Sequence, residues 1–194
     1  MMRIKEIINQ NIEIHRQILS DEKLLDKISS SAALIVDSLK NGGKIHFCGN
    51  GGSAADAQHL AAELSGRYYI DRPPLNAEAM HVNSSYVTAV ANDYGYDHIY
   101  SRLLAGTGKE GDVLVAISTS GNAANIIQAC RKAREINISV VSFTGETGGM
   151  LKGLSDILIN IPSMDTPRIQ EAHIMTGHII CEMVESELFS HLKH

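Results

Sequence analysis

Apolar residues recur every three or four positions through the first forty residues, which is the spacing of helices with one buried face. The first set is Ile4, Ile7, Ile8, Ile12 and Leu19. The second set is Leu24, Leu25, Ile28, Ala32, Ile35, Val36 and Leu39. Ser20 and Asp21 separate the two sets and are able to cap the second helix, which Asn41-Gly42-Gly43 ends. We therefore expect two helices before residue 44.

Beyond residue 44, short apolar runs alternate with amphipathic segments, a pattern typical of βαβ units and a parallel sheet. The expected strands are residues 44–48, 77–82, 113–117, 140–143 and 157–161. The expected helices are residues 54–64 and 123–136, and a long last helix that starts at Thr166-Pro167 and reaches about Leu192. The pattern predicts an α/β fold, a three-layer αβα sandwich with a five-stranded parallel sheet. We expect one domain over residues 1–194, with residues 1–40 as a helical extension.

The composition is that of an ordinary globular protein. Of 194 residues, 44% are hydrophobic and 20% charged, which argues against a disordered chain. The 17 basic and 22 acidic residues give a net charge of −5 with no basic cluster, so nucleic-acid and membrane partners are disfavoured. Cys48, Cys130 and Cys181 are widely spaced, which predicts neither a cysteine zinc site nor a disulfide framework. Without a long apolar run or a signal-peptide pattern, we expect a cytoplasmic protein.

Residues 118–122 place three hydroxyl side chains and a glycine between a strand and a helix. A helix N-terminus carries free backbone N–H groups and roughly half a positive charge, and hydroxyls add neutral donors. Such a loop suits a phosphate monoester. The alternative is that Ser118, Thr119 or Ser120 only caps the helix. We favour phosphate binding.

Residues 49–54 formally match the dinucleotide fingerprint G-x-G-x-x-G/A after a strand. A nicotinamide site also needs an acidic residue at the end of the next strand, and residues 80–83 contain none. We therefore favour the alternative that the glycines let a substrate lie against the backbone. Residues 52–56 also resemble residues 121–125, so two similar loops are expected at the carboxyl ends of strands, where α/β sheets bind ligands.

His59 and Glu63 are four residues apart on the helix that follows the glycines, so their side chains share one face. Imidazole and carboxylate are zinc ligands, and the carboxylate is alternatively a general base. An ordinary solvated polar pair has the same spacing, and two ligands do not complete a site. The last helix supplies more polar groups, namely Arg168, Gln170, Glu171, His173 and His178.

Helical periodicity does not decide which groups of the last helix are functional. Gln170 and His178 lie about 80° apart around the helix axis, whereas Glu171 and His178 lie about 20° apart. A histidine in a mostly apolar helix is either a buried structural residue or a functional group, and both alternatives stay open. Residues 92–95 (Asn-Asp-Tyr-Gly) have the composition of a polar turn. The histidines without metal-ligand spacing, interpreted as structural or surface residues, are His15, His46, His81, His98, His191 and His194.

Five segments, spread in order over nearly the whole chain, together resemble one family. They are residues 48–53 (CGNGGS), 59–67 (HLAAELSGR), 91–95 (ANDYG), 117–122 (ISTSGN) and 168–173 (RIQEAH). This set resembles the phosphoheptose isomerases, which have the sugar-isomerase (SIS) fold. The resemblance implies a five-stranded parallel sheet flanked by helices. It also implies a homotetramer with active sites between subunits.

The resemblance implies a reaction as well. The family converts the ketose sedoheptulose 7-phosphate into the aldose D-glycero-D-manno-heptose 7-phosphate. This is the first step toward the nucleotide-activated heptose used in lipopolysaccharide, capsule or S-layer glycans. The isomerisation moves a proton between C1 and C2 through an enediol, which needs a carboxylate base and an acid/base for the oxygens. Glu63 is the expected base and His178 its acid/base partner.

Carried over by motif, the resemblance implies one Zn²⁺ per subunit as a Lewis acid. Its ligands would be His59, Glu63, Gln170 and His178, so the family favours Gln170 over Glu171, and Gln170 would also orient the substrate. The phosphate would be held by Ser118, Thr119 and Ser120. The rest of the substrate would contact Asn50, Gly51, Gly52, Ser53, Glu63, Asn92 and Asp93.

Two positions depart from the family pattern. Ala123 replaces a serine that many members have after Ser-Gly-Asn, and Pro167 replaces an aspartate that some have before Arg-Ile-Gln. Neither removes a residue assigned to chemistry. One alternative is a non-catalytic SIS tetramer that binds a protein partner, but the relative of that kind lacks equivalents of Glu63 and His178. A second alternative is an isomerase of another sugar phosphate.

Overall fold

The computed structural model describes residues 1–192 and contains a five-stranded, wholly parallel sheet in the order β2-β1-β3-β4-β5. The strands are β1 (Ile45–Gly49), β2 (Ala77–Ala79), β3 (Val113–Ile117), β4 (Ser139–Thr144) and β5 (Ile157–Asn160). All five predicted strands are confirmed, although β2 is shorter than expected. His194 lies outside the described residues.

Helices make up most of the remaining chain. They are α1 (Met2–Ser20), α2 (Glu22–Lys40), α3 (Gly52–Ser65), α4 (Ser84–Tyr94), α5 (Ile99–Thr107), α6 (Ala124–Glu135) and α7 (Thr166–Leu188). Three short 3-10 segments are η1 (Tyr96–His98), η2 (Gly149–Gly153) and η3 (Ser190–Leu192). The side chain of Asp21 accepts a hydrogen bond from the N–H of Leu24 at 3.1 Å, so it caps α2 as predicted. Pro167 lies in the first turn of α7.

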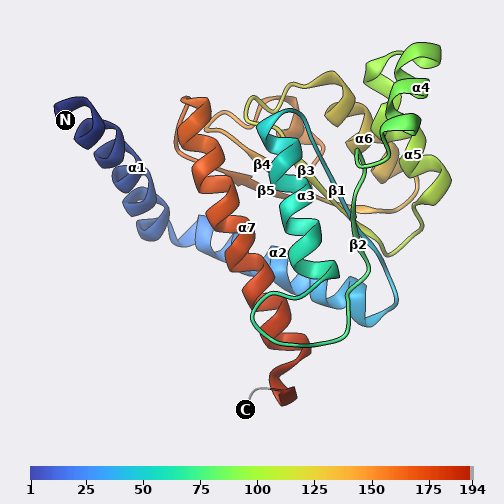
Figure 1. Cartoon of the computed structure of the whole chain (residues 1–194), viewed down its shortest axis with the longest axis horizontal. Coiled ribbons are helices and arrows are strands. Elements are labelled where there is room, and N and C mark those ends of the chain that lie inside the picture. The colour runs from blue at the N-terminus through green and yellow to red at the C-terminus, as the bar shows by residue number, and fades with distance from the viewer. Residues whose placement is uncertain (193–194) are drawn as a thin grey trace.

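Alternate residues of the central strands face opposite sides of the sheet, and each side has its own apolar core. Phe47 and Val115 pack with residues of α2, α3 and α7 on one side. Cys48 and Leu114 pack with residues of α5 and α6 on the other. Figure 1 shows α7 and α3 lying side by side over the first face. The predicted three-layer αβα sandwich is therefore confirmed.

Helices α4 and α5 were not predicted, and the expected turn at residues 92–95 is wrong in part. Asn92 and Asp93 belong to the last turn of α4, and the chain leaves the helix at Gly95. The reason is physical: the apolar face of α4 is short, with only Val90 fully buried and Tyr86, Val87 and Ala91 partly buried, and its β-branched residues have low helix propensity. Packing against α5 and η1 gives this segment its helical form.

The edge of the sheet at the amino ends of the strands is held by Asp112. This buried carboxylate pairs with His46 at 3.0 Å and accepts the N–H of Lys44 at 2.8 Å. His46 is therefore a structural residue, as its lack of metal-ligand spacing suggested. The described residues include no helix that is long and apolar enough to cross a membrane.

Candidate active site

The two candidate loops, residues 49–53 and 118–122, lie at the opposite edge, where the carboxyl ends of β1 and β3 are in register. Gly49 of β1 is level with Ile117 of β3, so the loops that follow the two strands leave the sheet side by side. The first loop leads into α3 and the second into α6. Ligands of α/β sheets bind at such an edge.

Helices α3 and α7 bring three titratable side chains together. His59 Nε2 lies 3.0 Å from Glu63 Oε1 and 3.4 Å from His178 Nε2. The two imidazole rings meet edge to face, with their centroids 4.9 Å apart. The His59 side chain is 49% exposed and that of Glu63 is 24% exposed, so the group is open to a ligand. The i,i+4 spacing predicted the first pair, and only the packing of α7 on α3 adds His178.

The three side chains fit a divalent metal ion. One ligand atom from each of His59, Glu63 and His178 lies within 4.8 Å of the other two. Nitrogen and oxygen ligands of tetrahedral zinc lie about 2.0–2.1 Å from the ion, and hence roughly 3.3 Å from one another. Two imidazole Nε2 atoms 3.4 Å apart are therefore already close to the separation that a shared cation requires. The two-histidine, one-carboxylate set also suits zinc chemically.

Gln170, the fourth ligand that the resemblance implies, lies beside the glycines at the start of α3. A Cβ on residue 52 would come within 2.6 Å of Gln170 Nε2 and 2.9 Å of its Oε1, so a larger residue there would displace this amide. On α7, Gln170 precedes His178 by eight residues, about 12 Å of helix rise. The structure thus places Gln170 where it faces the glycine loop.

The segment Ser118–Asn122, which we call the phosphate loop, leads from β3 toward α6. Ser118 is buried and its N–H donates to the Phe143 carbonyl at 2.9 Å, while Ser120 is exposed. Ser120 Oγ accepts the N–H of Asn122 at 3.1 Å. Helix α6 begins after Ala123 without a side-chain cap. The N–H of Ile126 in the first turn donates to Asn125 Oδ1, so the N–H groups of Ala124 and Asn125 are the ones that an anion could use.

A pair of asparagines connects the two loops. Asn50 and Asn125 exchange two amide hydrogen bonds of 2.8 Å, and the Tyr96 hydroxyl donates to Asn50 Oδ1 at 3.3 Å. Asn92 Nδ2 donates to Asp93 Oδ1 at 2.9 Å, and both residues are exposed. Of the segment after β2, Tyr96 thus reaches the glycine loop, as does Tyr100, whose hydroxyl donates to the Gly49 carbonyl. Gly51 has φ +55°, and Ser53 is buried in the first turn of α3.

Several groups at the site had no predicted role. Asp56 lies one turn before His59, and burial raises its pKa to about 6, although His59 opposes the rise. The ring of Tyr68 is 5.9 Å from that of His178. The resemblance of residues 52–56 to 121–125 matches Asp56 with Asn125, so the sequence held a weak signal for these two. Nothing in the periodicity indicated Tyr68.

A buried ion pair also escaped prediction. The side chains of Arg72 and Glu185 are 0% and 2% exposed, and Arg72 Nε donates to Glu185 Oε1 at 2.9 Å. Burial favours a raised pKa for Glu185, but N–H donors from residues 68–70 and from Arg72 outweigh it and hold the pKa below its usual range. Arg72 also donates to the Glu63 carbonyl at 2.9 Å. The pair therefore fastens the end of α3 and the following loop to α7.

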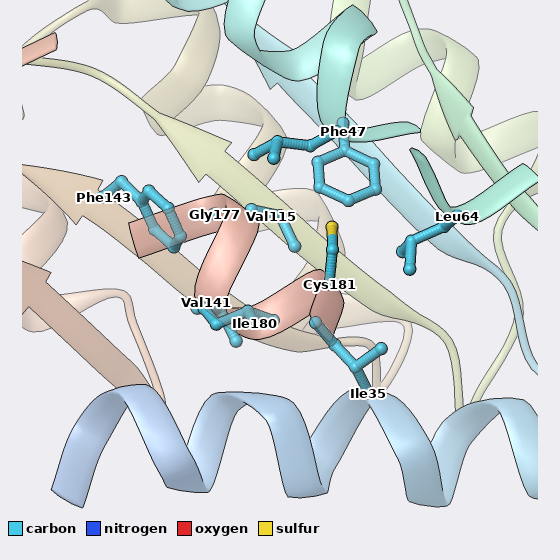
Figure 2. A pocket seen from close by; sticks show the side chains of 10 residues that line it. Ile35, Phe47, Leu64, Val115, Val141, Phe143, Gly177, Ile180 and Cys181 are labelled. Carbon is cyan, nitrogen blue, oxygen red and sulfur yellow. The ribbon is translucent and has the colours of Figure 1, made fainter. Parts of the chain in front are cut away.

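The interface beneath the site is apolar and nearly filled. Figure 2 shows side chains of β1, β3, β4, α2 and α3 around the segment of α7 that carries Gly177, Ile180 and Cys181. The cavity between them measures about 10 Å³, the least that would admit a water molecule, and its lining is wholly apolar. It is a small packing defect rather than a binding pocket for a sugar phosphate.

Comparison with known proteins assigns the chain to a family. The sequence model of the SIS domain matches residues 9–145. The phosphoheptose isomerase of Mycobacterium bovis (strain BCG / Pasteur 1173P2) is 50% identical over 186 residues, 96% of this chain and 95% of the relative. A phosphoheptose isomerase structure from Neisseria gonorrhoeae superposes with a TM-score of 0.90 at 40% identity, covering 95% of this chain and 98% of the other. One from Francisella tularensis gives 0.91 at 33% identity, with 95% and 97% covered. The chain therefore belongs to the SIS-domain family and, within it, to the phosphoheptose isomerases.

Proposed function

We propose that this enzyme converts sedoheptulose 7-phosphate into D-glycero-D-manno-heptose 7-phosphate. The observation that carries the proposal is the convergence of His59 and Glu63 of α3 with His178 of α7. A carboxylate next to imidazoles supplies the general base and the acid/base group that an aldose–ketose isomerase needs. It favours an enzyme over a SIS protein that only binds a partner.

The chain's own groups account for both proton movements. Glu63 takes a proton from C1 of the ketose and returns it to C2, while His178 moves a proton between the oxygens on C1 and C2. His59, 3.0 Å from Glu63, orients its carboxylate. The Arg72 bond to the Glu63 carbonyl keeps the backbone of this residue in place. Proton transfers by positioned groups of this kind contribute about 10²–10⁴-fold to the rate.

We further propose one Zn²⁺ per subunit, held by His59, Glu63 and His178 together with Gln170. The fit of the first three ligand atoms to a tetrahedral site supports this. When bound, zinc polarises the substrate oxygens as a Lewis acid. Gln170, against Gly52, also orients the substrate.

Two loops bind the rest of the substrate in this proposal. Ser118, Thr119 and Ser120, with the first N–H groups of α6, hold the phosphate. The uncapped start of α6 supports this assignment. The contacts to the sugar chain come from Asn50, Gly51, Gly52, Ser53, Asn92 and Asp93.

The assembly and setting of the enzyme follow as proposals. We propose a homotetramer, supported by the exposed apolar stripe Ile4, Ile8 and Ile12 on α1, which are 62%, 52% and 41% exposed. Figure 1 shows that α1 extends away from the sheet, so the rest of this chain does not cover its exposed face. We also propose that the enzyme works in the cytoplasm, at the start of nucleotide-activated heptose synthesis. Its three free, buried cysteines suit a reducing compartment.

The deciding experiment is turnover of sedoheptulose 7-phosphate by the purified protein, after chelation and again with zinc restored. We expect turnover to fall with the chelator and return with zinc. If the chelator did not change turnover, the proposed isomerase activity would stand and the proposed role of zinc would be wrong. No turnover from a folded protein would favour another sugar phosphate or a binding function.

The role of Glu63 has its own test in the same assay. We expect Glu63→Gln to fold normally and to lose at least about 100-fold in kcat, because an amide does not accept the C1 proton. Glu182→Gln, an exposed change one turn beyond His178, is the matched control and should keep its activity. Near-normal kcat in folded Glu63→Gln would remove Glu63 as the base.

A further inference from the structure

The amide pair between Asn50 and Asn125 joins the two loops of the site. Asn50 lies directly after β1, and Asn125 lies in the first turn of α6, just beyond the phosphate loop. Each Nδ2 donates to the other residue's Oδ1 at 2.8 Å. Asn125 is 2% exposed, whereas Asn50 is half-buried. The exposed side of the pair is therefore that of Asn50.

The backbone of α6 determines which way both amides are turned. The N–H of Ile126 donates to Asn125 Oδ1 at 3.0 Å. A backbone N–H is only a donor, so the Asn125 atom that faces it must be the oxygen. Asn125 Nδ2 then faces Asn50 Oδ1, and Asn50 Nδ2 faces Asn125 Oδ1. A flipped Asn50 would oppose donor to donor and acceptor to acceptor.

This arrangement leaves Asn50 with one kind of hydrogen bond to offer. Its Oδ1 accepts from Asn125 Nδ2 and from the Tyr96 hydroxyl at 3.3 Å, which occupies both lone pairs. Its Nδ2 uses one N–H on Asn125 and keeps the second. Asn50 is thus set as a donor toward an oxygen atom, such as a hydroxyl or carbonyl oxygen of a sugar.

We propose that Asn125 is a positioning residue that acts through Asn50, holding the remaining N–H toward an oxygen of the sugar chain. The proposal rests on the proposed function, in which Asn50 contacts the sugar. Because Asn125 belongs to the first turn of α6, the pair also fixes the distance between this donor and the phosphate loop. A substrate with its phosphate in place would then present the same oxygen to Asn50 each time.

A double-mutant cycle tests the proposal. kcat and KM are measured for the wild type, Asn50→Ala, Asn125→Ala and the double variant. In the wild-type background, Asn125→Ala should lower kcat/KM about tenfold, which corresponds to the loss of one hydrogen bond. In the Asn50→Ala background, it should lower kcat/KM by less than about twofold. Equal losses in both backgrounds would overturn the proposal, because Asn125 would then act without Asn50.

Asn125→Asp separates positioning from a purely structural role. The carboxylate still accepts the N–H of Ile126 but has no proton to donate to Asn50 Oδ1. A structural role would be restored by aspartate, whereas the positioning role predicts a loss at least as large as that of alanine. The control is Asn76→Ala, whose amide bonds the Gly43 carbonyl near the opposite edge of the sheet and should not affect kcat/KM.

A measurement without substrate keeps this test independent of the proposed function. In ¹⁵N-labelled protein, the side-chain NH₂ signals of Asn50 are assigned by their loss in Asn50→Ala. They should shift in Asn125→Ala and stay in place in Asn76→Ala. Unshifted signals would overturn the pairing. If the wild type does not turn over sedoheptulose 7-phosphate while the signals shift as expected, the proposed function fails and the pairing stands.

Discussion

The charge state of single residues on α7 follows from their burial, and His173 is the clearest case. It is 1% exposed, its Nε2–H donates to the Thr144 carbonyl at 3.1 Å, and its ring packs on Phe143. Burial lowers its pKa from 6.5 to about 4, although the hydrogen bond opposes this. His173 is therefore a neutral core residue, whereas His178, five residues later, is half-buried and joins His59 and Glu63.

The lowered pKa of His173 makes stability depend on pH. In the unfolded chain the imidazole takes up a proton near pH 6.5, while in the folded chain it stays neutral until about pH 4. The contribution of His173 to the free energy of unfolding is therefore complete above pH 6.5. It falls by about 3 kcal/mol as the pH drops toward 4. We expect denaturant unfolding at a series of pH values to show that the free energy of unfolding of His173→Gln falls by about 3 kcal/mol less than that of the wild type. The exposed control His98→Gln should parallel the wild type, and parallel curves for His173→Gln would contradict the prediction.

Removing the hydroxyl of Ser120 tests whether the phosphate loop binds the substrate phosphate. The side chain is exposed and its Oγ accepts the N–H of Asn122 at 3.1 Å, so its own O–H is left to donate to a ligand. A hydrogen bond to a charged group contributes about 1.5–3 kcal/mol, and the phosphate stays charged throughout the reaction. Ser120→Ala should therefore raise KM by roughly 10- to 100-fold with little change in kcat. Ser20→Ala at the end of α1 is the control, and an unchanged KM would place the phosphate elsewhere.

The packing of elements determines whether the group of His59, Glu63 and His178 forms. Helices α3 and α7 approach closely at Gly177, where a Cβ would lie 2.5 Å from both Leu60 methyl carbons. Gly177→Ala overpacks this contact and should cost about 1–2 kcal/mol, after the gain in helix propensity is allowed for. Because His178 is the next residue, kcat should fall as well. Thermal unfolding and turnover measure the two effects.

Gly106 on α5 is the matched control for this substitution. No atom lies within 4 Å of a Cβ built there, and its backbone is helical. Gly106→Ala should raise the free energy of unfolding by up to about 1 kcal/mol and leave kcat unchanged. If both variants gained stability, the contact between Gly177 and Leu60 would not limit the approach of the two helices.

How much of the structure was predictable from the sequence depended on how each element buries its residues. Strand β3, covered on both faces, reads as a run of apolar residues, and α2 has a clear apolar stripe. Helix α4, with one fully buried residue, carries only a short apolar face that is mostly partly buried. The same limit holds at the site: the i,i+4 rule paired His59 with Glu63, whereas the partners of Asn50 come from segments 46 and 75 residues away. Such pairs are a product of the sheet order, which periodicity does not encode.

At the scale of the whole molecule, the apolar stripe of α1 is a surface that a single chain leaves exposed to water. Ile14 and Ile18 face the body of the protein, while Ile4, Ile8 and Ile12 recur every four residues on an exposed face. Covering this stripe with a symmetry-related copy removes apolar surface from water and stabilises an assembly. We expect light scattering to give about 84 kDa, four copies of the 21.1 kDa chain.

Changing Ile4, Ile8 and Ile12 to serine should dissociate this tetramer into smaller species that keep their helical content. Turnover should fall with dissociation if the active sites lie between subunits, and raising the protein concentration should then restore both together. The control changes Lys5, Asn9 and Arg16, exposed polar residues of the same helix, to serine and should remain tetrameric. A triple-isoleucine variant that stayed at about 84 kDa would show that α1 does not hold the subunits together. The interface would then have to be sought on the other exposed elements, of which α4 buries the least.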